Sequence, residues 1–324
     1  MRFADGLPGQ LWLAPMAGVT DYAYRTICAG LGAEVTVTEM VSSRALVYQD
    51  KKSRTLLRKN AGSACGVQIF GNDPAIMAEA AGLALEASGC DFIDINMGCP
   101  MPKVAGTGDG SGLMRTPELA GRIVRAVTDA VPVPVTVKMR TGWDKGSINC
   151  VELAKICQDN GAAAVAVHGR TRTMLYSGTA DWDIIRCVKE ALTIPVIANG
   201  DIISPQAATR CLARTGADGL MVGRGCFGDP WLFAQLRAAL AGEENPARPP
   251  LAARIGVAEE QFALAMADKG EHIACLEARK YFSWYLRGVP YSNYYKERIS
   301  KISSAEEVRR IAAGIRRDLH DAGE

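Results

Sequence analysis

Short apolar runs rich in β-branched residues recur along the first 223 residues, and stretches with helical spacing separate them. The runs lie at 11–15, 33–38, 66–70, 91–96, 133–139, 163–169, 194–200 and 217–223. Their spacing of roughly 20 to 40 residues is what strand–helix–strand units require. Eight such strands with eight helices over about 230 residues predict an α/β fold, a (β/α)8 TIM barrel at 1–240. A doubly wound open sheet is the alternative, and five to seven strands would suit it better.

The rest of the chain has a different character. The segment AGEENPARPP (241–250) is rich in proline and charge and has no periodicity, so we interpret it as a linker. Residues 251–324 contain no convincing strand, and two long stretches within them have helical spacing. We expect a small all-α domain at 251–324, appended to the barrel.

The composition excludes several classes of protein. Lys and Arg total 37 against 35 Asp and Glu, so any nucleic-acid-binding surface must be local. No apolar run approaches the roughly 18 residues of a membrane span, and the N-terminus lacks a signal-peptide core. We therefore expect a cytoplasmic protein with reduced thiols and no membrane partner. The ten cysteines form no C-x-x-C pair and the three histidines are scattered, so we expect no metal site.

Polar or small residues stand at the end of each predicted strand. In a barrel of this kind these ends converge on one mouth, where the active site lies. At any single position a cap or a satisfied polar group would explain the residue, but a complete ring indicates a polar ligand. The ring comprises Pro15, Met16, Glu39, Gln68, Asn96, Cys99, Lys138, Arg140, His168, Arg170, Asn199, Gly200, Asp201, Gly223 and Arg224.

The last two strand ends favour a phosphate. Loops after the seventh and eighth strands commonly hold phosphate in this fold. Gly200 and Gly223 allow close backbone approach, Arg224 supplies a forked cation, and a helix starting near 204–205 offers free N–H groups. Lys138 adds a second cation, while the Gln68 amide and the Pro15–Met16 surface suit a flat heterocycle.

The glycine-rich stretch GTGDGSG (106–112) fails as a dinucleotide-binding loop. The G-x-G-x-x-G spacing would need glycine at 111, which is Ser111, and the stretch does not link a strand directly to a helix. We interpret it as a mobile loop beside the active site.

Cys99 is the cysteine whose position indicates chemistry. It follows the strand at 91–96 on a loop at the predicted mouth, whereas Cys28, Cys157 and Cys211 fall in helical patterns. A thiol with an ordinary pKa near 8.5 is mostly protonated at pH 7. Cys99 can therefore serve as a general acid as well as a nucleophile.

Several motifs in this order resemble the tRNA-dihydrouridine synthase family, and within it the bacterial DusB subgroup. They are LAPMAGVTD, VTEMVSS, GVQIFG, DINMGCP, VKMRTGW, VHGRTR, IPVIANGDI and MVGRG, which cover the barrel, and RKYFSWYLRG in the helical part. Two departures stand out: Gly112 and Met114 lie in the loop after the cysteine, and Tyr281 replaces a usual histidine.

The resemblance implies FMN, NADPH or NADH as reductant, and reduction of a D-loop uridine of tRNA, at position 17 for the DusB likeness. It implies that Cys99 protonates C5 while flavin N5 delivers hydride to C6. It places Asn96, Arg140 and Arg170 near the substrate, and we expect a monomer. The implied cofactor-binding residues are Pro15, Met16, Gln68, Lys138, His168, Asn199, Gly200, Asp201, Gly223 and Arg224.

Two local charge biases favour an RNA partner. Residues 41–60 carry six basic residues against one acidic, and 279–301 carry six against one, with seven aromatics interleaved. Lys280 and Arg287 are the candidate RNA-binding residues, because basic side chains bind phosphate and aromatics stack on unpaired bases. The alternative is a helix with an aromatic core face and a solvated basic face.

Two other functions remain open from the sequence. One is a flavin barrel that reduces a free pyrimidine or another small metabolite, and the other is a non-catalytic RNA-binding protein. The basic, aromatic C-terminal part argues against the first, and the intact Cys99 with its ring of polar residues argues against the second.

Overall fold

The computed structural model describes residues 9–321, and within them eight parallel strands close into a barrel. Consecutive barrel strands pair with one another, β2 pairs with β4, and β9 pairs back with β1. The predicted (β/α)8 TIM barrel is confirmed, and the open sheet is wrong. The strands are β1 (Leu11–Leu13), β2 (Val35–Val37), β4 (Ala64–Phe70), β5 (Phe92–Met97), β6 (Val135–Arg140), β7 (Ala164–His168), β8 (Val196–Asn199) and β9 (Gly219–Val222).

Each of the eight predicted strands is present, usually with tighter bounds. One further strand, β3 (Val41–Ser42), pairs with the C-terminal end of β4. It was not predicted, because two residues are too short to show a period of two.

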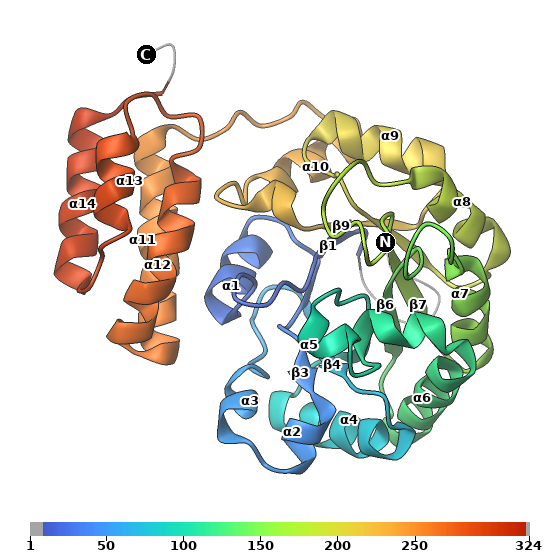
Figure 1. The fold of residues 1–324 in the computed structure, drawn as a ribbon. Helices are drawn as coiled ribbons and strands as arrows, with labels where there is room; N and C mark the ends of the chain where they lie inside the picture. Colours follow the sequence, from blue (N-terminus) through green and yellow to red (C-terminus); the bar gives the residue numbers. More distant parts are fainter. Residues whose placement is uncertain (1–8, 322–324) are drawn as a thin grey trace.

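Helices surround the barrel, as Figure 1 shows. No helix within residues 9–321 is long and apolar enough to cross a membrane. The segment expected as a loop at 106–112 instead enters a short 3-10 helix, η1. The helices of this part are α1 (Tyr22–Gly30), α2 (Ser43–Val47), α3 (Lys51–Thr55), α4 (Pro74–Ser88), α5 (Pro102–Ala105), η1 (Gly110–Arg115), α6 (Pro117–Ala130), α7 (Cys150–Asp159), α8 (Trp182–Ala191), α9 (Pro205–Thr215), η2 (Arg224–Cys226) and α10 (Leu232–Ala241).

The interior of the barrel changes from apolar to polar along the strands. Alternate residues of a strand point to the same face, so Phe92, Asp94 and Asn96 of β5 share the interior face. Phe92 packs on Trp12 with ring centroids 5.6 Å apart, whereas Asp94 and Asn96 make hydrogen bonds. The polar end is the C-terminal end of the strands, so that end is where a polar ligand finds partners.

A bundle of four helices follows residues 243–250, which have no regular structure. We call α11 (Leu251–Lys269), α12 (Glu271–Tyr285), α13 (Asn293–Ile299) and α14 (Ala305–Asp318) the helical bundle. It has its own cluster of buried apolar residues and packs beside α1, as Figure 1 shows. The boundaries at 240 and 251 as limits of separate domains stay predictions.

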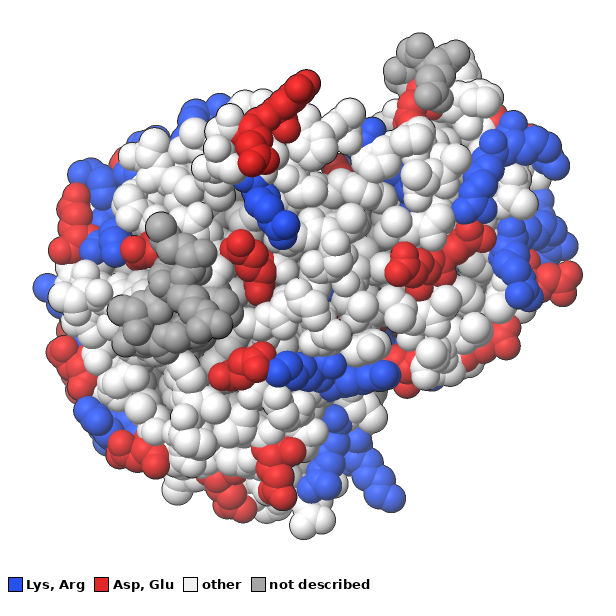
Figure 2. All heavy atoms as spheres, turned by 180° about the vertical axis from the view of Figure 1, so that it is seen from behind, with Lys and Arg blue, Asp and Glu red and all other residues white. Residues whose placement is uncertain are grey.

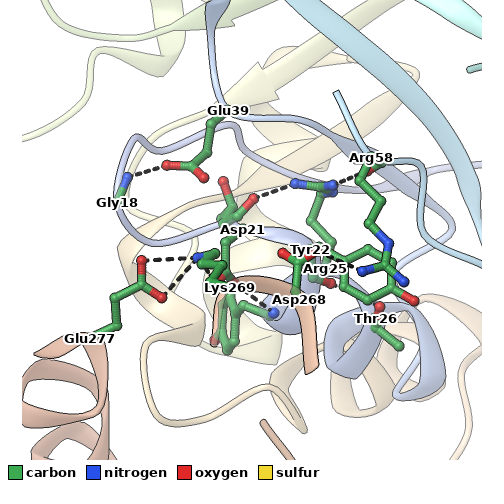
Figure 3. A network of polar contacts seen from close by, with 12 residues as sticks. Gly18, Asp21, Tyr22, Arg25, Thr26, Glu39, Arg58, Asp268, Lys269 and Glu277 are labelled. Carbon is green, nitrogen blue, oxygen red and sulfur yellow. Dashed lines mark hydrogen bonds and ion pairs between the residues drawn. The ribbon is translucent and has the colours of Figure 1, made fainter. Parts of the chain in front are cut away.

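A network of charged groups joins the barrel to the helical bundle (Figure 3). Lys269 Nζ donates to Asp21 Oδ2 at 2.6 Å and to both carboxylate oxygens of Glu277 at 2.8 and 2.9 Å. Beside it, Arg58 Nη1 lies 2.6 Å from Asp268 Oδ1. Asp21 also caps α1, so the first helix of the barrel and the end of α11 are tied at one point.

The tight interior of the barrel gives a first prediction. A Cβ atom added at Gly66 of β4 would lie 2.2 Å from the Phe92 ring, whereas one added at Gly82 within α4 would meet nothing within 4 Å. Gly66→Ala is expected to lower the free energy of unfolding by about 1–3 kcal/mol through overpacking. Gly82→Ala, the matched control, is expected to raise it by up to about 1 kcal/mol. Urea denaturation followed by circular dichroism measures both, and an unchanged or higher midpoint for Gly66→Ala would contradict this packing.

Candidate active site

A cavity of about 450 Å³ opens at the C-terminal ends of the barrel strands. It brings together every residue of the predicted ring except Glu39, which instead accepts from the Gly18 amide. The residues that line it are Pro15, Met16, Gln68, Asn96, Cys99, Lys138, Arg140, His168, Arg170, Asn199, Gly200, Asp201, Gly223 and Arg224. Lys280 and Arg287 do not line it. No group of three or more His, Cys, Asp or Glu side chains in the described part of the chain is placed to hold a metal ion.

Cys99 lies on the turn that leaves β5, and its backbone is held on both sides. Asn96 Oδ1 accepts hydrogen bonds from the Cys99 amide at 2.8 Å and the Gly98 amide at 3.1 Å. This local turn is why an asparagine stands at the end of the strand. On the other side, the Cys99 carbonyl accepts from the Ser111 hydroxyl at 2.8 Å. The glycine-rich segment thus lies beside the active site, as predicted, and η1 supports the cysteine.

The Cys99 thiol is largely protonated at neutral pH. Only 8% of the residue is exposed, and burial raises the pKa of the thiol above its ordinary value. A backbone hydrogen bond and the charges of Arg140 and Lys138 oppose this rise without reversing it. The sulfur therefore holds a proton and faces cations that would stabilise it after the proton leaves.

Asn96 is itself oriented by a chain of hydrogen bonds that runs down into the barrel. Its Nδ2 donates to Gln68 Oε1 at 2.8 Å, and Gln68 Nε2 donates to Asp94 Oδ2 at 2.6 Å. Asp94 Oδ1 accepts from Thr136 at 2.6 Å. Burial raises the pKa of Asp94 to about 6, while the Thr136 and Gln68 hydrogen bonds and the charge of Lys138 favour its ionised form. The carboxylate accepts only, so it sets the direction of both amides above it.

Sequence reasoning missed Asp94. It stands two residues before Asn96 in the same buried strand, which places it on the same interior face. A carboxylate in the middle of a run such as DFIDIN was the available signal, because an ionised group is rarely buried without partners.

Cations crowd the cavity beside the turn of Cys99. Burial and the nearby charge of Arg140 lower the pKa of Lys138 to about 8, and burial lowers that of Arg140 to about 10. Burial, with the charges of Lys138 and three arginines, lowers the pKa of His168 to about 2. Both cations stay mostly charged at neutral pH and His168 stays neutral. An anionic ligand would relieve their mutual repulsion.

Lys138 and Asn199 face each other across the strand ends. Lys138 Nζ lies 3.2 Å from Asn199 Oδ1, and Asn199 Nδ2 donates to the Met221 carbonyl at 2.7 Å. The Lys138 ammonium therefore keeps further donors for a ligand.

Arg140 was expected to face the substrate, and the structure gives it a second task. Its Nε donates to the Gly98 carbonyl, and its Nη1 donates to the carbonyls of Thr171 and Leu175, each at 2.9 Å. It is only 3% exposed. Arg140 thus ties the turn of Cys99 to the loop after β7.

Arg170 is held in the same way. It donates to the carbonyls of Ser177 and Gly178 and to Asp201 Oδ2, the last at 2.8 Å. Asp201 also accepts from the Ala180 amide at 2.7 Å. Both residues were predicted as direct ligand contacts, yet their hydrogen bonds within the chain anchor the loop after β7 to the end of β8.

The predicted phosphate side contains the expected glycines and arginine. Gly200 has a φ of +119°, and a Cβ there would lie 2.7 Å from that of Ala180. Arg224 remains half exposed, 3.8 Å from Asp201. The predicted helix is present as α9. Its cap residue Ser204 accepts a hydrogen bond from the Ala207 amide, so that N–H group at the start of the helix is already paired.

Several other residues complete the walls. Met40, Tyr176 and Phe227 line the cavity and were not predicted. The guanidinium of Arg224 lies 4.5 Å from the centre of the Tyr176 ring, and that of Arg140 lies 5.8 Å from it. Tyr176 stands in a turn-rich segment without periodicity, so no pattern in the sequence marked it.

The helical bundle only partly matches the prediction of an aromatic RNA-binding surface. The alternative of an aromatic core face holds for Tyr281, Phe282, Tyr285 and Tyr295, which are buried. Tyr291 and Tyr294 are exposed.

Two basic residues of the stretch at 41–60 form ion pairs within the chain. Lys59 pairs with Asp91 at the N-terminal end of β5, which is the far end of the barrel from the cavity, and Arg58 pairs with Asp268. On the face seen in Figure 2, acidic and basic side chains are interspersed over both parts of the molecule. Two of the six basic residues of that stretch are thus engaged in ion pairs, and the RNA-binding surface expected from it stays a prediction.

Lys280 and Arg287 have different partners. Lys280 Nζ donates to the carbonyl of Gly18, in the loop after β1. Arg287 is exposed just after α12, where its charge acts on Asp229.

Comparisons with known proteins agree on the family. The family model described as dihydrouridine synthase (Dus) matches residues 12–319. A protein of Rickettsia conorii named probable tRNA-dihydrouridine synthase is 44% identical over 293 residues, covering 90% of this chain and 88% of the relative. The tRNA-dihydrouridine synthase B of Pseudomonas aeruginosa is 42% identical over 301 residues, covering 93% and 90%.

Among solved structures, histamine dehydrogenase from Rhizobium sp. 4-9 matches with a TM-score of 0.56 at 14% identity, covering 79% of this chain. This chain spans about half of that longer one, at 49%. At such low identity the likeness shows the barrel fold alone. The match to the family model over nearly the whole chain, with relatives above 40% identity, shows that the chain belongs to the dihydrouridine synthase family.

Proposed function

We propose that this protein is a tRNA-dihydrouridine synthase that uses FMN, and NADPH or NADH, to reduce a D-loop uridine to 5,6-dihydrouridine. The observation that carries the proposal is the buried Cys99 thiol, fixed at the mouth of a cavity that it shares with Lys138 and Arg140. Family membership and the names of the relatives support the reaction. We further propose that the reduced uridine is at position 17, and that the enzyme acts as a cytoplasmic monomer.

The cavity residues fit a flavin mononucleotide. Arg224, Gly200 and Gly223 suit the phosphate. The guanidinium can pair with its charge, and the glycines let it come close to the backbone. Lys138 offers unused donors near the barrel axis, and the Gln68 amide suits a ring edge that both donates and accepts. Pro15 and Met16 offer an apolar surface for a flat ring.

A flavin held by Arg224, Lys138 and Gln68 would supply the hydride that adds to C6 of the uracil ring. Hydride at C6 leaves negative charge at C5 and O4, and a proton must reach C5. Cys99 Sγ is the donor on this chain, with Asn96 holding its backbone in place. Lys138 and Arg140 lower the energy of the thiolate that remains, and water restores its proton.

The target uridine must leave its stack to reach the cavity. We propose that the cavity mouth and the helical bundle together receive the tRNA, with Arg287 and the exposed Tyr291 and Tyr294 among the contacts. Basic side chains would bind the phosphates, and exposed aromatic rings would stack on unpaired bases.

Replacing the acid gives the direct test of the mechanism. Cys99→Ala is expected to retain flavin and nicotinamide oxidation, while uridine reduction falls by about 10²- to 10⁴-fold, the usual contribution of a general acid. Stopped-flow measurement of the two half-reactions separates them. Cys187→Ala is the matched control, because Cys187 lies on α8, away from the cavity, and should leave both rates unchanged. Full uridine reduction by Cys99→Ala would remove Cys99 from its role.

The raised pKa of the thiol predicts a specific pH dependence. The acid is active only while protonated, so uridine reduction should fall as the pH rises through the Cys99 pKa, above its ordinary value near 8.5. Lys138, with its pKa lowered to about 8, also titrates in this range. Loss confined to uridine reduction indicates Cys99, and loss in both half-reactions indicates Lys138. Uridine reduction that stays constant from pH 7 to the alkaline limit would contradict a cysteine acid.

A further inference from the structure

Two segments that wall the cavity are held from outside the barrel by one helix, α12. The first is the loop after β1, residues 14–20, and the second is the segment after β9, residues 223–228. Together they contribute Ala14, Pro15, Met16, Ala17, Val19, Gly223, Arg224, Gly225 and Phe227 to the cavity. The helical bundle contributes no lining residue itself, so any influence it has on the cavity passes through these two segments.

The loop after β1 is held by hydrogen bonds on both sides of Gly18. The amide of Gly18 donates to Glu39 Oε1 from the barrel, as Figure 3 shows, and its carbonyl accepts from Lys280 Nζ of α12. Gly18 has a φ of +72°, a conformation that favours glycine. Three residues later Asp21 accepts from Lys269, which Glu277 of α12 holds in place. This loop thus contacts the helical bundle at Gly18, and the helix that follows it contacts the bundle at Asp21.

The segment after β9 packs directly on α12. Phe227 stacks on Trp284 with ring centroids 4.5 Å apart and planes 16° apart. Gly228 has a φ of +68°, and a Cβ there would lie 2.3 Å from the Trp284 backbone. Lys280 Nζ lies 5.8 Å from the centre of the Trp284 ring. The contacts made by Lys280 and by Trp284 are therefore adjacent on one face of α12.

A bundle that served only to hold RNA would need no contact with the cavity walls. Here the contacts are one aromatic stack and one lysine-to-carbonyl bond, and each involves a turn with a glycine at positive φ. Lys280 was predicted to contact RNA, yet its ammonium is engaged with Gly18.

We propose that α12 positions the cofactor cavity: Trp284 and Lys280 hold the segments 223–228 and 14–20 in the geometry that binds the flavin. The identity of the ligand rests on the proposed function, but the bracing of the two segments does not. Trp284 and Lys280 are positioning residues, since neither lines the cavity.

Hydrogen exchange of the full-length protein without flavin tests the brace itself. Suitable probes are the hydrogen-bonded amides of Val19, Thr20, Cys226 and Phe227. Trp284→Leu should speed exchange at 226 and 227, and Lys280→Met, which keeps the aliphatic stem, should speed exchange at 19 and 20. Strands β5 and β6 should not change. Unchanged exchange in both segments would overturn the proposal.

Titration with FMN, followed by flavin fluorescence, tests the effect on binding. Trp284→Leu is expected to weaken FMN affinity by about three- to tenfold, the value of an aromatic pair, and Trp284→Phe to restore it to within about twofold. Lys280→Met should weaken it by about two- to fourfold, as loss of one exposed charged contact implies. Arg309→Ala, an exposed change on α14, is the control and should leave it unchanged.

The outcomes separate the two claims. If the wild type binds no FMN, the proposed function fails, while hydrogen exchange still decides the brace. If folded Trp284→Leu and Lys280→Met bind FMN as the wild type does and lose only tRNA, the positioning role is overturned. If Trp284→Leu does not fold, Lys280→Met and Trp284→Phe decide the matter.

Discussion

The crowding of positive charge at one end of the barrel is the constraint on which the site depends. Lys138, Arg140 and Arg170 are brought to one mouth by the register of β6 and β7, and Arg224 joins them from the end of β9. Burial opposes their charges, as the pKa of about 8 for Lys138 indicates. Asp201 pairs with Arg170 and lies near Arg224. One carboxylate does not balance these four cations, so much of the positive charge is left for a ligand. An anion bound there would be stabilised by groups that already bear the cost of burial.

That constraint also selects one thiol from ten. Nine of the cysteines are buried, and most lie in the apolar contacts between barrel and helices or within the bundle. Cys99 alone among them lines the cavity. Its backbone is held by Asn96. The Asn96 amide is oriented by its hydrogen bond to Gln68, which is oriented in turn by its hydrogen bond to Asp94. A chain of hydrogen bonds thus positions the acid, and burial keeps its thiol protonated. The nearby cations would stabilise the thiolate that forms when the proton leaves.

Much of this was predictable from the sequence, because period and strand-end chemistry are local properties. The eight strands, the convergence of polar residues and the position of Cys99 follow from runs of a few residues. What could not be predicted depends on pairing across the fold. Lys280 contacts Gly18 across 262 residues, and Phe227, in the turn after η2, stacks on Trp284 of α12. Aromatic spacing in 281–295 could not separate the buried Tyr285 from the exposed Tyr294, because both patterns suit a helix that packs on one face.

The most direct test of the central claim is a map of dihydrouridine in tRNA from cells that lack this protein, before and after incubation with the purified enzyme, FMN and NADPH. The account predicts that at least one D-loop uridine is unmodified in those cells, and that the purified protein converts it to dihydrouridine while Cys99→Ala does not. A D-loop uridine that stays unmodified after incubation with the active, flavin-loaded protein, or a map identical to that of normal cells, would contradict it.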